Sequence, residues 1–176
     1  MPDAIPISAA AGYQLWADTW DDTPSPIAAL ENRALLPWLD SETPRCAVDV
    51  GCGTGRWTAR LSAIGVDASP AMLAVAARKE GLHGRLAVGE ATALPVATGS
   101  ADLVLCALTF GHIRDQAGAF REFARVLHSG GVLILSDFTR RPRLRAGGAH
   151  FGTRARYTNS RTIRTPCRNS AKWRAN

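Results

Sequence analysis

The last part of the sequence contains no acidic residues. All 15 Asp and Glu residues lie before position 140, where they outnumber the 10 Lys and Arg residues. Residues 140–176 carry the other 11 basic residues, so the net charge of +6 belongs to this stretch alone. A run of like charge is usually solvated and disordered. The basic composition therefore does not by itself indicate a nucleic-acid-binding domain.

Cysteine pairs and long apolar runs are missing as well. The four cysteines show no Cys-x-x-Cys spacing, so the sequence predicts neither a zinc site nor a disulfide framework. No run approaches the 18 apolar residues that a membrane-spanning helix needs, and the amino terminus lacks the basic and apolar pattern of a secretory signal. We therefore expect no metal, no membrane partner and a cytoplasmic location.

Three alternate glycines stand where a strand-like apolar run gives way to a helical pattern. Gly51, Gly53 and Gly55 follow the apolar run 46–50 and precede a helical pattern at 57–64. Glycine is required where the backbone adopts positive φ or passes close to another group. A glycine loop between a parallel strand and its helix lies at the carboxyl edge of an open α/β sheet, where such folds bind ligands.

The spacing of these glycines differs from that of a dinucleotide-binding loop. Such loops have Gly-x-Gly-x-x-Gly with an acid about 20 residues further on. Here the pattern is Gly-x-Gly-x-Gly, and Asp67 follows Gly51 by 16 positions. In addition, Asp49 precedes the loop, and a carboxylate there would repel a pyrophosphate but attract an ammonium or a sulfonium. A nicotinamide-dependent oxidoreductase is therefore disfavoured.

Five ordered sequence blocks carry a family resemblance. They are residues 48–55, 65–73, 89–95, 102–104 and 125–131. Together they resemble the class I S-adenosylmethionine-dependent methyltransferases, in particular the small-molecule enzymes of the ubiquinone, menaquinone and biotin pathways. The resemblance implies S-adenosylmethionine as cofactor and a small-molecule methyl acceptor, whose identity the sequence leaves open.

The resemblance also assigns the parts of the cofactor to particular residues. It gives the methionine end to Asp49 and the glycine loop, the ribose to Asp67 and the adenine to Glu90. The complete set of cofactor-binding residues that it implies is Asp49, Gly51, Cys52, Gly53, Asp67, Ala68, Glu90 and Ala91. A carboxylate can accept hydrogen bonds from two adjacent hydroxyls, which suits Asp67 to a ribose. The alternative for Asp67 is a helix-capping or loop role.

His112 is the candidate catalytic residue. It follows the apolar run 102–108, which is typical of a strand that a parallel sheet buries on both faces. A histidine titrates near neutrality and could take a proton from a hydroxyl or amine acceptor. The alternative is a histidine that shapes the pocket or caps a helix.

Residues 1–43 are expected to form a helical segment that covers the site. The aromatic and acidic stretch 13–21 has two interpretations. It folds over the cofactor, as similar segments do in the resembling family, or it packs Leu15 and Trp16 on the sheet domain. The stretch that follows has apolar residues at helical spacing, which predicts a helix with this face against the sheet. These residues are Ile27, Leu30, Ala34 and Trp38.

Strand-like and helix-like stretches alternate through residues 44–139. This order predicts an α/β core with a Rossmann-like, open, mostly parallel sheet of about five strands and helices on both faces. The alternation stops at residues 140–176, where the resembling family has further strands that complete a seven-stranded sheet. We expect a basic, disordered tail here, and a fifth strand that is left as an exposed edge.

The sequence thus predicts a methyltransferase that acts on a small molecule. Two alternatives remain: a truncated, non-catalytic cofactor-binding remnant, and a nucleic-acid-binding protein that uses its basic tail. Nucleic acid is the less favoured partner, because the basic residues gather in residues 140–176 alone. The oligomeric state cannot be predicted.

Overall fold

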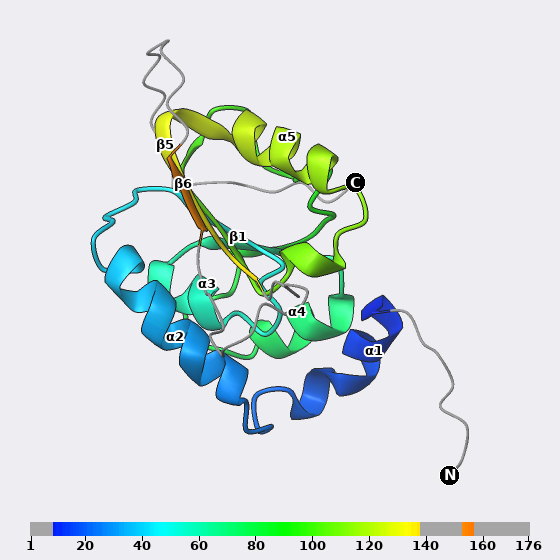
Figure 1. Ribbon diagram of the computed structural model, residues 1–176. Coiled ribbons are helices and arrows are strands. Elements are labelled where there is room, and N and C mark those ends of the chain that lie inside the picture. The colour runs from blue at the N-terminus through cyan, green and yellow to red at the C-terminus, as the bar shows by residue number, and fades with distance from the viewer. Residues whose placement is uncertain (1–8, 138–152, 157–176) are drawn as a thin grey trace, which may run out of the picture.

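The protein folds as an open six-stranded sheet with helices on both faces (Figure 1). The computed structural model describes residues 9–137 and 153–156. The strand order is β3-β2-β1-β4-β5-β6, in which the first five strands are parallel and β6 is antiparallel to β5. The predicted Rossmann-like architecture with five parallel strands is therefore confirmed.

The elements follow one another in the expected alternation. The strands are β1 (Ala47–Val50), β2 (Ile64–Asp67), β3 (Leu86–Val88), β4 (Ala101–Ala107), β5 (Leu127–Ser136) and β6 (Thr153–Arg156). The α-helices are α1 (Ala9–Trp16), α2 (Pro26–Leu39), α3 (Arg56–Leu61), α4 (Pro70–Ala76) and α5 (Gln116–Val126). Two 3-10 turns, η1 (Ala17–Thr19) and η2 (Phe110–His112), lie after α1 and β4.

Side chains of the central strands alternate between two hydrophobic layers, because successive residues of a strand face opposite sides of the sheet. Figure 1 shows α5 on one side of the sheet and α2 on the other. The layer under α5 includes Val48, Val50, Val104, Leu133 and Phe123. The opposite layer includes Ala47, Leu103, Ile134, Leu35 and Trp57, from the strands, α2 and α3. Burial on both faces explains the near-continuous apolar sequence of β4 and β5.

Helix α2 turns inward a different face from the one that its apolar spacing predicts. The buried residues are Glu31, Leu35 and Leu39. The residues Ile27, Leu30 and Trp38 are 41%, 49% and 44% exposed. The predicted inward face was therefore wrong. Spacing alone could not decide between the two faces, because the inward one contains a carboxylate whose hydrogen-bond partners come from α3 and β5.

The amino-terminal segment does not pack Leu15 and Trp16 on the sheet. Leu15 is 80% exposed, Trp16 is also exposed, and Ala17 is the residue that η1 buries. Helix α1 and η1 pack instead on α4, which follows β2 (Figure 1). The other interpretation, in which this stretch folds over the cofactor, stays a prediction.

A sixth strand lies in the basic stretch, where none was expected. Residues of β6 pair with β5 in the register Val132↔Arg156 to Leu135↔Thr153. The prediction of an exposed fifth strand was therefore wrong over these positions. Pairing requires only backbone N–H and C=O groups, and an edge strand commonly carries charged residues, so the sequence lacked the apolar alternation of an inner strand. The rest of the expected tail lies outside the described residues.

In residues 9–137 and 153–156, no helix has both the length and the apolar character needed to cross a bilayer.

Candidate functional site

The candidate residues meet at the carboxyl edge of the sheet, where the five parallel strands end. In the order of the sheet, Glu90 and Ala91 follow β3, Asp67 ends β2 and precedes Ala68, Gly51, Cys52 and Gly53 follow β1, His112 follows β4, and Asp137 follows β5. Asp49 lies within β1, one residue before its end. The structure thus brings every predicted site residue to one edge, and their individual roles stay predictions.

The amides at the start of the glycine loop are bonded to β2. Gly51 and Cys52 donate their backbone N–H groups to the Val66 carbonyl, at 2.7 and 3.1 Å. The Gly53 N–H donates to Oδ2 of Asp67 at 2.7 Å. These three donors are therefore turned toward the neighbouring strand and do not form a cradle for a phosphate.

Gly53 borders open space. Its φ is +55°, and a Cβ added there would have no atom within 4 Å. Gly51, with φ +70°, is instead covered by Thr109, whose hydroxyl donates to the Gly51 carbonyl at 3.2 Å. The loop therefore leaves room beside Gly53 for a ligand to approach the backbone closely.

Asp67 is held by two backbone amides and keeps further capacity to accept hydrogen bonds. Oδ2 accepts from Gly53 N, and Oδ1 accepts from Ser69 N at 2.8 Å. An ionised carboxylate has about four acceptor sites, so each oxygen retains one. Ser69 itself caps α4, because its hydroxyl accepts from Met72 N at 3.3 Å. Asp67 thus orders the loop and can still receive two adjacent hydroxyls.

Asp49 lies beneath the loop and is almost inaccessible to solvent. Its exposed fraction is 2%, and its Oδ2 accepts a hydrogen bond from the Thr58 hydroxyl at 2.6 Å. Burial raises the pKa of Asp49 to about 7, the hydrogen bonds from Thr58 oppose this shift, and the charges of Asp67 and Glu31 add to it. Asp49 therefore supports the loop from below and sets the local charge, while direct contact with a cofactor stays a prediction.

The other predicted cofactor residues differ in exposure. Cys52 is buried, and burial together with the charges of Asp49 and Asp67 raises the pKa of its thiol. Cys52 therefore keeps a protonated thiol, and its backbone N–H and C=O are bonded to Val66 and Gly55. Ala68 and Glu90 are exposed, whereas Ala91 is half-buried against the layer under α5.

His112 lies on the other side of the glycine loop from Asp67, at the end of β4. Its Nε2 is 3.1 Å from the Tyr13 hydroxyl, and the two rings meet edge to face with centroids 5.6 Å apart. Next to it, the Gly111 N–H donates to Oδ2 of Asp137. Burial raises the pKa of Tyr13, and the charges of Asp67 and then Asp137 raise it further. Tyr13 therefore stands over the edge between these two carboxylates.

Polar contacts fasten the amino-terminal segment to the loop region. The Thr54 hydroxyl donates to Oδ1 of Asp21 at 2.6 Å, and Oδ2 of Asp21 lies 2.7 Å from Lys79 Nζ. Thr54 belongs to the glycine loop and is buried, so Asp21 joins this loop to the segment between α1 and α2. The acidic and aromatic composition of 13–21 indicated such a segment but not these partners.

Glu31 is the site-region residue that sequence reasoning missed. It is fully buried in α2, forms an ion pair with Arg56 and accepts from the Ser136 hydroxyl at 2.6 Å. Trp57 Nε1 adds a third donor at 3.4 Å. The carboxylate thus ties α2 to the helix that leaves the glycine loop and to the end of β5. A lone Glu in a helix is far more often exposed, so no sequence pattern indicated that Glu31 would be buried.

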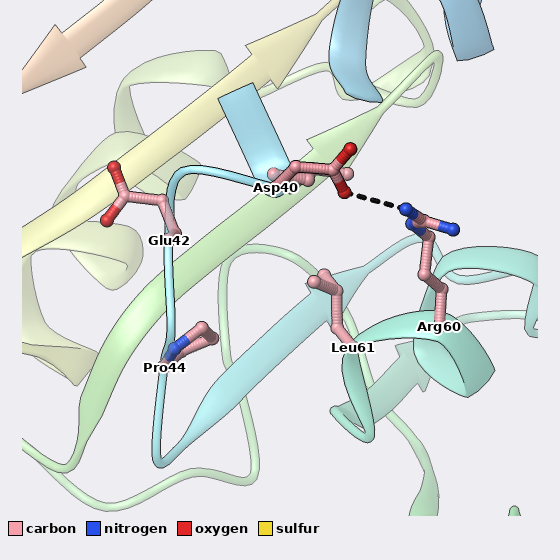
Figure 2. A pocket seen from close by; sticks show the side chains of 6 residues that line it. Asp40, Glu42, Pro44, Arg60 and Leu61 are labelled. Atoms are coloured by element: carbon pink, nitrogen blue, oxygen red, sulfur yellow. Dashed lines mark hydrogen bonds and ion pairs between the residues drawn. The ribbon is translucent and has the colours of Figure 1, made fainter. Parts of the chain in front are cut away.

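An open hollow of about 470 Å³ lies at the opposite end of β1 (Figure 2). It is lined by Leu39, Asp40, Glu42, Pro44, Arg60 and Leu61. Asp40 and Arg60 form an ion pair of 2.6 Å at its rim, and both side chains are largely exposed. Its lining comes from the residues before β1 and from the end of α3, and it includes none of the candidate residues, so the hollow is separate from the predicted site.

Comparison with known proteins gives the same assignment as the sequence blocks. Residues 48–135 match a family described as a methyltransferase domain. The chain is 38% identical over 145 residues to an uncharacterised protein of Mycobacterium tuberculosis, covering 79% of this chain and 49% of that protein. It is 37% identical over 129 residues to malonyl-[acyl-carrier protein] O-methyltransferase 1 of Coxiella burnetii, covering 68% and 43%. The chain spans about half the length of these relatives.

Solved structures share the fold. An S-adenosylmethionine-dependent methyltransferase of Thermotoga maritima superposes with a TM-score of 0.58 at 28% identity, covering 73% of this chain and 61% of that one. Another, from Methanococcus maripaludis, gives a TM-score of 0.60 at 21% identity, covering 78% and 68%, and supports the fold alone.

Proposed function

Because the chain belongs to the methyltransferase domain family, we propose that it transfers a methyl group from S-adenosylmethionine to a small-molecule acceptor. The observation that carries this proposal is the pairing of an open glycine loop with Asp67 at the carboxyl edge. The loop amides are turned away from a phosphate, and Asp67 keeps acceptor capacity for two ribose hydroxyls. Asp49 lies buried below the loop, and its carboxylate, when ionised, favours a cationic ligand beside it.

Different residues at the carboxyl edge of the sheet would bind different parts of the cofactor. When bound, S-adenosylmethionine supplies an electrophilic methyl group on a sulfonium. Asp67 would accept from the ribose, Gly53 would let the methionine end approach the backbone, and exposed Glu90 would accept from the adenine amine. Such binding orients the methyl toward an acceptor, and orientation alone can contribute up to roughly 7–11 kcal/mol to lowering a barrier.

The acceptor side of the site begins at His112. An acceptor hydroxyl or amine must lose a proton when it is methylated, and an exposed imidazole at the end of β4 can take it. His112 is therefore the proposed base for acceptors that carry such a proton. An acceptor that has already lost its proton would need only to be positioned.

The relatives do not supply one acceptor for this chain. One is named for malonyl-[acyl-carrier protein], and a relative from Thermus thermophilus, 34% identical over 58% of this chain and 51% of its own length, is named demethylmenaquinone methyltransferase. These names describe chemically different acceptors. We therefore propose the reaction and the cofactor, and leave the acceptor at the level of a small molecule.

Substitution of Asp67 tests the proposal. In Asp67→Asn, an amide replaces the charged acceptor, and hydrogen bonds to a charged group contribute about 1.5–3 kcal/mol. We therefore expect S-adenosylmethionine to bind about 10- to 100-fold more weakly by calorimetry.

Asp40→Asn is the matched control, because it removes a carboxylate at the opposite edge of the sheet. Thermal unfolding of both variants identifies any general loss of structure. Wild-type affinity in a folded Asp67→Asn protein would remove Asp67 from the site.

A further inference from the structure

The contact between Tyr13 and His112 joins two parts of the chain that are 99 residues apart. Tyr13 comes from α1, and His112 comes from η2 at the end of β4. The hydroxyl and Nε2 are 3.1 Å apart, a normal hydrogen-bond length, and the rings are nearly perpendicular at 88°. Trp20 packs on the other side of the pair, with its ring centroid 5.5 Å from that of Tyr13. One hydrogen bond and two edge-to-face ring contacts, with His112 and Trp20, therefore hold the Tyr13 hydroxyl against Nε2 of His112.

Two arrangements of protons satisfy this distance. Either the Tyr13 hydroxyl donates to an unprotonated Nε2, or Nε2–H donates to the hydroxyl oxygen. In the second arrangement, the half-buried hydroxyl proton needs another acceptor. In the first, the unpaired donor is the Nδ1–H of His112, which is exposed and can bond to water. An unsatisfied donor costs more when it is half-buried, like the Tyr13 hydroxyl, than when it is exposed, like Nδ1–H of His112. The arrangement in which Tyr13 donates to Nε2 is therefore favoured.

The charges around Tyr13 favour the same arrangement. The pKa of Tyr13 is raised by burial and by the carboxylates of Asp67 and Asp137. The hydroxyl therefore keeps its proton and remains a donor. Gly111 is bonded to Asp137 next to His112, so η2 is itself fixed with respect to the end of β5.

We propose that Tyr13 is a positioning residue, whose hydroxyl donates to Nε2 of His112 and holds the neutral ring as the tautomer protonated on Nδ1. The only ring lone pair of neutral His112 is then on Nε2 and accepts from Tyr13, so it can take a proton from an acceptor only when the acceptor displaces the Tyr13 hydroxyl. Helix α1 thereby becomes part of the acceptor side of the site. The inference rests on the proposed function, because it assigns a part to the same site.

The tautomer can be read directly from the ring nitrogens. The full chain is labelled with ¹⁵N-histidine and examined by NMR in mildly alkaline buffer, where a ring N–H and a bare ring nitrogen have well-separated ¹⁵N shifts. His112→Gln assigns the signals. We expect wild-type His112 to carry its proton on Nδ1, and Tyr13→Phe, which keeps the ring but removes the hydroxyl, to shift the proton toward Nε2.

Leu15→Ala is the matched control, since Leu15 lies in the same helix and is mostly exposed. It should leave the tautomer unchanged. A wild-type ring protonated on Nε2 would overturn the inference, and so would an unchanged Nδ1–H signal in folded Tyr13→Phe. The wild-type spectrum decides even if that variant fails to fold. Calorimetry with S-adenosylmethionine on the same wild-type sample keeps the two proposals separate, since absence of binding would refute the proposed function and not the tautomer.

Discussion

The two carboxylates at the centre of the site, Asp49 and Asp67, differ in burial, and this difference separates their roles. Asp67 is partly exposed and has acceptor capacity beyond its two amide partners. Asp49 is enclosed, with the Thr58 hydroxyl as its nearest donor. A carboxylate in that position is costly to ionise, because desolvation penalises the charged form. Asp67 is therefore suited to direct contact with a ligand, whereas Asp49 is bonded to Thr58 beneath the loop.

Asp49→Asn should change how stability depends on pH. The folded-state pKa of about 7 lies above the ordinary 3.8, so the folded protein binds the proton more tightly than the unfolded chain. Stability from this group is present below about pH 4 and falls as pH rises to about 7. Asparagine does not titrate, so Asp49→Asn should escape this fall and gain on the order of 2–4 kcal/mol over wild type above pH 7.

Urea denaturation of both proteins between about pH 4 and pH 8, without cofactor, measures this difference. Asp40→Asn serves as the control, because it makes the same substitution at an exposed carboxylate at the opposite edge of the sheet. If the free energy of unfolding changed with pH in the same way for wild type and Asp49→Asn, burial would not raise the pKa of Asp49.

The sequence predicted the positions of the candidate residues on the sheet better than it predicted their hydrogen-bond partners. Asp67 could be placed because it ends a strand next to the glycine loop, and parallel topology brings all such ends to one edge. The bond between Tyr13 and His112 could not be foreseen, because nothing in the local pattern fixes how α1 lies across that edge. Glu31 was missed for a related reason, since its burial depends on donors supplied by two other elements.

Among the elements, the glycine loop would most restrict how the proposed cofactor approaches the sheet. Its first amides are fixed to β2, and its far end leads directly into α3. Gly53 is the loop position at which an added Cβ meets open space, although the backbone there has positive φ. The positive φ already favours glycine at this position, and the open space beside it also lets a ligand approach the backbone.

Gly53→Ala should weaken cofactor binding more than it weakens folding. Positive φ costs a non-glycine residue about 1–2 kcal/mol, and the new methyl would occupy space that the cofactor needs. Gly99→Ala is a close control, because Gly99 also has positive φ and open space but lies in the turn before β4. We expect similar losses in thermal stability, and at least a roughly 10-fold loss of S-adenosylmethionine affinity in Gly53→Ala alone. Equal affinities in the two variants would mean that the cofactor does not approach Gly53.

The two errors in predicting elements have a common cause. Helix α2 carries apolar residues on both of its faces, and tertiary partners selected the face with Glu31. Strand β6 has a basic sequence, and it becomes an edge strand because its backbone pairs with that of β5. Periodicity identifies an element when one face is clearly apolar. It fails where the choice is made by groups far away in the sequence.

At the scale of the whole molecule, the sheet order explains why one edge collects the site. The strands β3, β2, β1, β4 and β5 run parallel, so their carboxyl ends lie side by side in that order. The cofactor residues follow the first three strands, and His112 and Asp137 follow the last two. Cofactor and acceptor would thus be held on adjacent parts of one edge, with Tyr13 between them.

All of the proposed cofactor-binding residues lie in the part of the chain that the structure describes and within the matched range 48–135. The chain spans about half the length of its curated relatives, and two of these relatives are named for different acceptors. The proposal for the cofactor is therefore more specific than the proposal for the acceptor.

The proposal that this chain binds S-adenosylmethionine is tested by calorimetry of the purified full chain, with NAD as the control ligand. We expect saturable binding of S-adenosylmethionine alone, because the loop amides are bonded to β2 and because Asp49 and Asp67 disfavour a pyrophosphate. Absence of S-adenosylmethionine binding by a chain that is demonstrably folded, or tighter binding of NAD, would contradict it.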